Sequence, residues 1–318
     1  MFRPPMYRIL QLRFLFAGFI AVMLSGCTSM NKLAVNKLGD ALASGGTAFS
    51  SDSDPELVRD AAPFSLKLME SLLAENPHHA GLLYAAASGF TQYSYAFVQQ
   101  DADVIENTDV AAATALRARA RGLYLRGRDY GLRGLEEAHP GLTAALRQNP
   151  VAALRPCQPA DVRLLYWTAV SWAAAIAAAK DDPALIADLP AAESLIDRAL
   201  DLDESYDHGA IHSFLITYEM GRRTGTGDPI ARSRQHFERA MKLADNAQAS
   251  PLVAYAEAVC IQQQDRTQFL SLLKQALALD VNARPEFRLV NLVMQRRARW
   301  LLGRVDELFL PVDSPPAP

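Results

Sequence analysis

The sequence predicts an all-α fold, and three observations support this prediction. Alanine, leucine and arginine, which all favour helices, are abundant, whereas aromatic and β-branched residues are sparse. Apolar residues recur at the three- and four-residue spacing of helices through most of residues 55–310. A short pattern that begins with a small residue also recurs near the expected ends of several helices. We therefore expect helical hairpins packed into one compact bundle.

The composition narrows the class of protein. Half of the 318 residues are hydrophobic and 21% are charged, which is ordinary globular composition and excludes collagen-like, disordered and polytopic membrane proteins. The 32 basic and 35 acidic residues give a net charge of −3, which argues against nucleic acid as a partner. Three cysteines are too few for a disulfide framework.

The amino-terminal segment resembles a lipoprotein signal peptide. Arg3, Arg8 and Arg13 form a cationic region, and an apolar run of about 11 residues follows at 14–24. The run ends in the tetrapeptide Leu-Ser-Gly-Cys, which places two small residues before the thiol of Cys27. We expect cleavage after residue 26 and lipidation of Cys27, which tethers the chain to a membrane. The alternative is an uncleaved anchor helix with a chance cysteine.

Processing at this position changes the charge and suggests a location. Removal of residues 1–26 leaves 292 residues and takes away three arginines and no acid, so the net charge becomes −6. Thr28, rather than an aspartate, follows the cysteine. In a bacterium with two membranes this favours the inner leaflet of the outer membrane, so that the folded domain lies in the periplasm.

We divide the remaining chain into three parts. Residues 27–54 form a lipidated tether, residues 55–310 a helical-repeat domain, and residues 311–318, with four prolines, a disordered tail. Asp54 and Pro55 are a favourable cap and first residue for a helix that stops near Asn76. We expect its buried stripe at Leu57, Ala61, Phe64, Leu68 and Leu72. A second helix then runs from about residue 82 to 97.

Four short segments share one pattern, in which a small residue is followed by apolar residues and preceded by another apolar residue three positions earlier. The small residues are Ser71, Ala199, Ala240 and Ala276. A small residue lets a paired helix approach closely, as in the first helix of a tetratricopeptide-like hairpin. The last three are 41 and 36 residues apart, so the repeat is degenerate and the array is α-solenoid-like rather than a regular superhelix.

Two central helices carry most of the candidate binding residues. The first spans about 115–135 and has an apolar stripe that six arginines surround between Arg117 and Arg133. These arginines either face a carboxylate ligand or an acidic partner, or they form a solvated surface. The second, Ala-rich helix contains Trp167 and Trp172, which either line an apolar channel or belong to the core.

No catalytic motif is present in the sequence, so we expect a protein that is not an enzyme and needs no cofactor. His208 and His212 are four residues apart and would share one helix face, where Glu204 or Asp207 could complete a metal site. Capping or hydrogen bonding in the core is the alternative for this pair. We favour no metal, and a position in a cleft for His212.

Other polar and thiol groups remain open. Asn291 and Gln295 lie one helical turn apart, and buried amides need partners from the protein, a ligand or water. Cys157 and Cys260 could pair in the periplasm, although two unpaired thiols with Cys260 in the core are the favoured interpretation. The Gly-rich segment at 224–228 is expected to be a turn between helices.

Taken together, the lipoprotein signal and several segments in order resemble the TatT family, the tetratricopeptide-like lipoproteins associated with TRAP transporters. The resemblance covers about residues 27–310. The matching segments are 119–132, Trp167 with Trp172, 199–203, 209–212, 236–240, and Asn291 with Gln295.

The resemblance implies a periplasmic lipoprotein with a cleft or pore through each protomer, which assembles as a homotrimer. It implies docking of the extracytoplasmic substrate-binding P component, and the binding or passage of a small hydrophobic or carboxylate ligand. The residues expected to face the cleft are Tyr124, Arg128, Trp167, Trp172, His212, Tyr218, Asn291 and Gln295.

Two other functions stay open from the sequence. The first is a structural outer-membrane lipoprotein that scaffolds envelope or secretion machinery through its repeats. The second, weaker alternative is a metalloprotein that uses His208 and His212.

Overall fold

The computed structural model describes residues 37–42 and 46–311. Every regular element in these ranges is a helix, which confirms the all-α prediction. No helix among these residues is long and apolar enough to cross a membrane. The predicted signal peptide, Cys27, Thr28 and residues 312–318 of the predicted tail lie outside the described ranges.

The bounds of the helices follow the chain in order. The first part contains α2 (Gly46–Ser50), α3 (Pro55–Glu75), α4 (Ala80–Tyr93), the π-helix η1 (Ser94–Gln99), α5 (Gln100–Ile105), α6 (Val110–Ala138), α7 (Leu142–Gln148) and α8 (Pro150–Ala153). The middle contains the 3₁₀ turn η2 (Pro159–Asp161), α9 (Val162–Ala177), α10 (Pro183–Ala187), α11 (Leu189–Leu202), α12 (Tyr206–Gly221) and α13 (Pro229–Leu243). The last part contains α14 (Ala249–Tyr255), the π-helix η3 (Ala256–Cys260), α15 (Ile261–Gln263), α16 (Arg266–Ala278), the 3₁₀ turn η4 (Pro285–Phe287), α17 (Arg288–Leu302) and α18 (Val305–Leu308).

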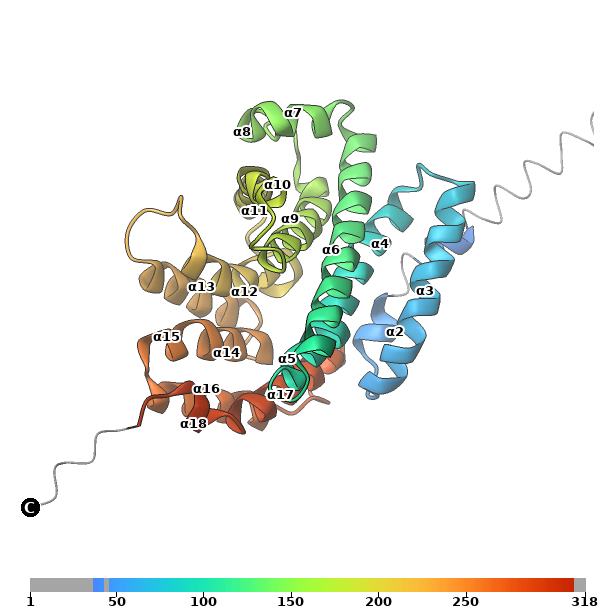
Figure 1. Cartoon of the computed structure of the whole chain (residues 1–318). Coiled ribbons are helices and arrows are strands. Elements are labelled where there is room, and N and C mark those ends of the chain that lie inside the picture. Colours follow the sequence, from blue (N-terminus) through green and yellow to red (C-terminus); the bar gives the residue numbers. More distant parts are fainter. Residues whose placement is uncertain (1–36, 43–45, 312–318) are drawn as a thin grey trace, which may run out of the picture.

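The long helix α6 occupies the middle of the molecule (Figure 1). It packs against both α4 and α9, which also contact each other, while α3 packs against α4 and α11 against α9. The chain then continues through α12 and α13 to a lower group made of α14, α16 and α17 (Figure 1). Large apolar clusters fill the space around α9 and α11 and the space between α13, α14, α16 and α17.

The boundaries of α3 follow its sequence, but its buried face does not. The Asp54 carboxylate accepts hydrogen bonds from two backbone N–H groups of the first turn, and Pro55 begins the helix as predicted. The predicted stripe is wrong at two positions, because Leu57 is 58% exposed and Phe64 is 72% exposed. Leu72 of the stripe is buried and Leu68 packs against the same cluster, together with Leu66 and Leu73. The helix has two apolar faces, and only one of them packs against α4.

Glycines allow α6 to lie unusually close to its neighbours. A Cβ atom on Gly127 would approach the side chains of Thr91 and Ser171, and one on Gly131 would lie 2.1 Å from Oγ1 of Thr168. Thr91 belongs to α4, whereas the other two residues belong to α9. The centre of the fold therefore depends on small residues on both sides of α6.

The connection between α11 and α12 departs from a simple hairpin turn. Asp207, His208 and Gly209 have positive φ values of 45°, 55° and 87°, so the helical part of α12 effectively begins after them. Helix α12 packs most extensively against α13, and α11 packs most extensively against α9. The tetratricopeptide-like pairing of successive helices therefore stays a prediction.

The two ends of the helical domain meet. Helix α17 packs against α2 and α3, as the red and blue helices at the bottom of Figure 1 indicate. Arg288 donates to the backbone carbonyl of Ser51 at 2.7 Å, and Arg296 donates to that of Ala96 at 2.6 Å. Arg297 pairs with Asp103 at 2.8 Å.

Candidate functional site

The helices α6 and α9 bring together two of the residues predicted to face a cleft. The Arg128 guanidinium lies over the ring of Trp172, with its carbon 5.3 Å from the ring centroid. The indole N–H of Trp172 donates to the Asp188 carboxylate at 3.3 Å, and the side chain of Arg128 donates to Asp129. An arginine on an aromatic face keeps its cation near an apolar surface, which suits recognition of a carboxylate.

Trp167 and Tyr218 border the same apolar cluster as Trp172. Tyr166 packs edge-on against Trp167, with the two ring centroids 4.9 Å apart. The indole N–H of Trp167 is buried and has no hydrogen-bond partner among the described residues. Tyr218 stacks on Phe214 at 5.3 Å. Buried indole N–H groups are normally paired, so Trp167 has an unused donor beside this cluster.

Charged side chains form a network next to Tyr218. No local pattern in the sequence indicates this network. The Tyr218 hydroxyl donates to Glu193 at 3.2 Å. Glu193 and Glu219 are only 4% and 3% exposed, and Arg222 approaches both of them. Hydrogen bonding to Asp197 is the main cause that raises the pKa of Arg222. Two buried carboxylates remain stable here because paired guanidinium groups compensate for their loss of water.

Tyr124 lies in a separate, smaller cluster. Its side chain is buried, and its hydroxyl donates to Oε1 of Gln99 at 2.6 Å. Burial raises the pKa of Tyr124 above its usual range, so the phenol stays neutral and serves as a hydrogen-bond donor. Gln99 belongs to the π-helical segment η1.

His212 pairs with a second histidine that comes from α13. The Nδ1 atoms of His212 and His236 are 2.8 Å apart, and Nε2 of His212 is 3.3 Å from a carboxylate oxygen of Glu204. If Nε2 of a neutral His212 donates to Glu204, its Nδ1 has no proton and accepts a hydrogen bond from Nδ1 of His236. Burial lowers the pKa of both histidines, that of His236 to about 4. The pair is therefore neutral near pH 7.

His208 and His212 do not share one helix face, which the alternative of a metal site at this pair required. The two residues do not share a regular helix, because the backbone at 207–209 is left-handed. His208 instead packs edge-on against Phe287, with ring centroids 4.9 Å apart. The left-handed backbone directs the two imidazoles to different neighbours. The two side chains therefore lack the i, i+4 spacing of a helical metal site.

Asn291 and Gln295 bind backbone groups of neighbouring segments. The Asn291 side chain accepts from the N–H of Ala249 at 2.8 Å and donates to the carbonyl of Ala247 at 2.9 Å. Gln295 donates to the carbonyls of Ala276 and Leu279, at 3.1 and 2.9 Å. These bonds hold the start of α14 and the end of α16 to α17. A position of either amide in a cleft stays a prediction.

The arginines of α6 separate into two groups. Arg119, Arg126 and Arg133 are exposed and recur every seven residues. Each guanidinium lies over an aromatic ring, with carbon-to-centroid distances of 5.9, 5.5 and 5.3 Å. Arg117 instead pairs with Asp103 and Glu106. The exposed three form a stripe on the surface.

Among the described residues, two cysteines are unpaired, and a groove lies beside α13. Cys157 and Cys260 are both free and buried, in different apolar clusters, which confirms the interpretation of unpaired thiols. A groove of about 550 Å³ lies beside α13 and is lined by Phe237, Glu238, Met241, Lys242, Asp245, Asn246, Leu252 and Gln275. The predicted cleft residues are not part of this groove. A central cleft or pore stays a prediction.

Comparison with known proteins identifies the family. Residues 51–309 match the family model of the TRAP transporter T-component, which spans nearly the whole helical domain. The chain belongs to the TRAP transporter T-component family. This T-component is also 33% identical over 266 residues to a protein of Treponema pallidum (strain Nichols), described as uncharacterized, and the match covers 82% of each chain. The resemblance to the TatT family is thereby confirmed.

Proposed function

We propose that this T-component is a lipid-anchored periplasmic accessory protein of a TRAP-type uptake system, in which it docks the substrate-binding component. The observation that carries the proposal is the family match over residues 51–309. The signal-like segment that ends at Cys27 supports an anchor at the membrane, which would hold the domain beside its partners.

Purification of the protein from its native host, together with the proteins bound to it, tests which partner it docks. The full chain, with a carboxy-terminal affinity tag, is expressed from its own promoter, cross-linked in cells and purified for quantitative mass spectrometry. We expect enrichment of an extracytoplasmic substrate-binding protein over a Cys27→Ser control, which lacks the lipid acceptor. Enrichment of envelope or secretion proteins without any TRAP component would refute the proposal and favour the scaffold function.

A small carboxylate or hydrophobic ligand belongs to the same proposal. Arg128 on Trp172 and the unpaired N–H of Trp167 offer one cation and one donor beside apolar surface. We expect a panel of short- and medium-chain carboxylates to change the intrinsic fluorescence of the protein. The response should disappear in Trp167→Phe and persist in Trp300→Phe, because Trp300 packs against a different cluster. Equal responses in the two variants would refute this location.

The oligomer is a further part of the proposal. We expect the full chain in detergent to have three times the monomer mass when light scattering is corrected for bound detergent. A monomer at all concentrations tested would remove the trimer from the proposal, without any effect on docking.

A further inference from the structure

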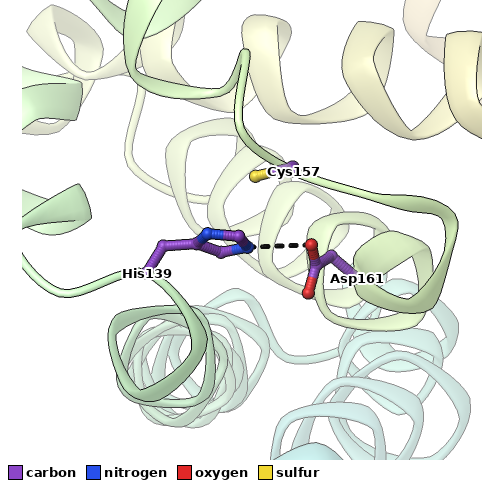
Figure 2. A group of neighbouring side chains, drawn as sticks. All are labelled: His139, Cys157 and Asp161. Atoms are coloured by element: carbon purple, nitrogen blue, oxygen red, sulfur yellow. Dashed lines mark hydrogen bonds and ion pairs between the residues drawn. The ribbon is translucent and has the colours of Figure 1, made fainter.

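A histidine, a cysteine and an aspartate from three separate segments converge at one end of α6 and α9. Figure 2 shows His139, Cys157 and Asp161 facing one another, with the imidazole bonded to the carboxylate. One ligand atom from each residue lies within 4.8 Å of the others. His139 Nε2 and Asp161 Oδ2 are 2.8 Å apart. This group is distinct from the residues expected to face a cleft.

The local backbone holds each of the three residues in place. His139 caps the end of α6, where its N–H donates to the carbonyl of Leu135 at 2.8 Å. Asp161 ends the 3₁₀ turn η2, and its Oδ2 also accepts from the backbone N–H of Gln158 at 2.8 Å. The carbonyl of Cys157 accepts from Arg198 at 2.7 Å. The bond from Gln158 orients the Asp161 carboxylate directly, as partners of metal ligands do, whereas the other two bonds fix the backbone of His139 and Cys157.

The donor atoms favour one class of ion. Sulfur, imidazole nitrogen and a single carboxylate suit Zn²⁺ and related transition-metal ions, whereas Ca²⁺ and Mg²⁺ prefer sites made of oxygen. In a tetrahedral Zn²⁺ site the ligand atoms are about 3.3–3.6 Å apart, as follows from metal–ligand distances of about 2.0–2.3 Å. To form the site, the hydrogen bond between His139 and Asp161 would break, with the imidazole proton on Nδ1, and their two atoms would separate from 2.8 Å. The most distant ligand atoms, within 4.8 Å of one another, would move closer by about 1 Å.

The partial exposure of His139 and Asp161 would allow an ion to enter from solvent. The side chains of His139 and Asp161 are 20% and 13% exposed, while Cys157 is fully buried behind them. A cysteine nucleophile activated by this histidine is the competing interpretation. Cys157 has no exposed surface, so its sulfur is poorly placed to attack a substrate from solution. The sulfur can still bind a metal ion that displaces its proton.

We propose that His139, Cys157 and Asp161 bind one Zn²⁺-class divalent ion, with water at the fourth position. The ion would link the end of α6 to the loop after α8 and to the start of α9. Its role goes beyond docking or ligand passage, because it would fix one end of the helix pair that carries Arg128 and Trp172.

Cobalt gives a direct test. The untagged full chain in detergent is stripped with a chelator and titrated with Co²⁺, which gives a sulfur-to-cobalt charge-transfer band and intense visible bands only in a thiolate-containing, four-coordinate site. We expect one equivalent to bind, and Zn²⁺ to displace it. Cys157→Ala should abolish the charge-transfer band. His139→Gln and Asp161→Asn should weaken binding by at least the roughly 10- to 100-fold that the loss of a hydrogen-bond partner of a ligand costs, because each removes a ligand.

Cys260→Ala is the matched control, because this thiol is also free and buried but lies in another cluster. It should keep the full cobalt spectrum. Absence of the band in the unmodified protein would overturn the proposal, and so would a band that Cys157→Ala retains, since that would assign it to another thiol.

Thermal unfolding in the presence of Zn²⁺ provides a second measurement that does not depend on the cysteine variant. Zn²⁺ should raise the unfolding temperature of the unmodified protein and of Cys260→Ala. At the same Zn²⁺ concentration the rise should be clearly smaller in His139→Gln, because its affinity for the ion is lower. An equal rise in His139→Gln would overturn the proposal. Neither measurement involves a TRAP component, so failure here would leave the proposed function intact.

Discussion

Replacement of Gly131 by alanine tests whether close contact between α6 and α9 holds the centre of the fold. A Cβ atom at this position would lie 2.1 Å from Oγ1 of Thr168 and 3.3 Å from its Cα atom. The Thr168 hydroxyl is already committed, because it donates to the carbonyl of Leu164 at 2.6 Å. Rotation of the hydroxyl away from the new methyl group would lose this bond, and the backbone contact would remain tight.

The expected size of the effect follows from three contributions. Alanine gains about 0.5–1 kcal/mol over glycine in a helix interior. Overpacking of a close contact costs about 1–3 kcal/mol. Loss of the Thr168 hydrogen bond costs about 1 kcal/mol more. We expect Gly131→Ala to lower the free energy of unfolding by about 1–3 kcal/mol.

Gly122 provides a control in the same helix. A Cβ atom there would meet nothing within 4 Å, so Gly122→Ala should stabilise the protein by about 0.5–1 kcal/mol. Denaturant unfolding, followed by far-ultraviolet circular dichroism of the full chain in one detergent, should move in opposite directions for the two variants. Adding Thr168→Ala to Gly131→Ala should recover part of the loss. Equal stabilities for Gly131→Ala and Gly122→Ala would refute the reasoning.

The remaining predictions concern three polar sites in the described structure. Because burial lowers the pKa of His236 from 6.5 to about 4, the folded protein binds fewer protons than the unfolded chain between these values. Its stability should therefore fall as the pH drops from 6.5 towards 4 and be independent of this group at higher pH, and His236→Asn should reduce that slope in thermal melts. Arg297→Ala leaves two carboxylates without their buried cation and should cost about 3–5 kcal/mol in denaturant unfolding, whereas the exposed Asp306→Asn should cost less than about 1 kcal/mol. Similar losses for the two would contradict a buried ion pair. Asn291→Leu removes two buried hydrogen bonds to the backbone and should cost about 2–4 kcal/mol, so unchanged unfolding would show that the amide does not hold α14.

The sequence predicted the helices well because their signals are local. Asp54, followed by a proline, places the beginning of α3 correctly, and Asp228 with Pro229 begins α13 in the same way. The choice of buried face in α3 failed at Leu57 and Phe64, because it depends on the partner helix rather than on the spacing of apolar residues.

The candidate site was harder to predict because its contacts join distant residues. His236, the partner of His212, lies 24 residues away, and no local pattern connects the two. The left-handed backbone at Asp207 and His208 was hidden as well, since neither residue type requires a positive φ. Gly209 was the one local signal for a break in the helix.

The contacts between α17 and the first helices have a consequence for how this protein folds. Arg296 reaches Glu56 across 240 residues of sequence, and Arg297 reaches Asp103 across 194. In an open array of repeats, each unit depends only on its neighbours and the ends fray first. Here each end covers the other, so deletion of α17 should loosen α3 as well. During synthesis, the packing of α2 and α3 cannot be completed until α17, near the end of the chain, has been made. Such long-range contacts favour slow and highly cooperative folding.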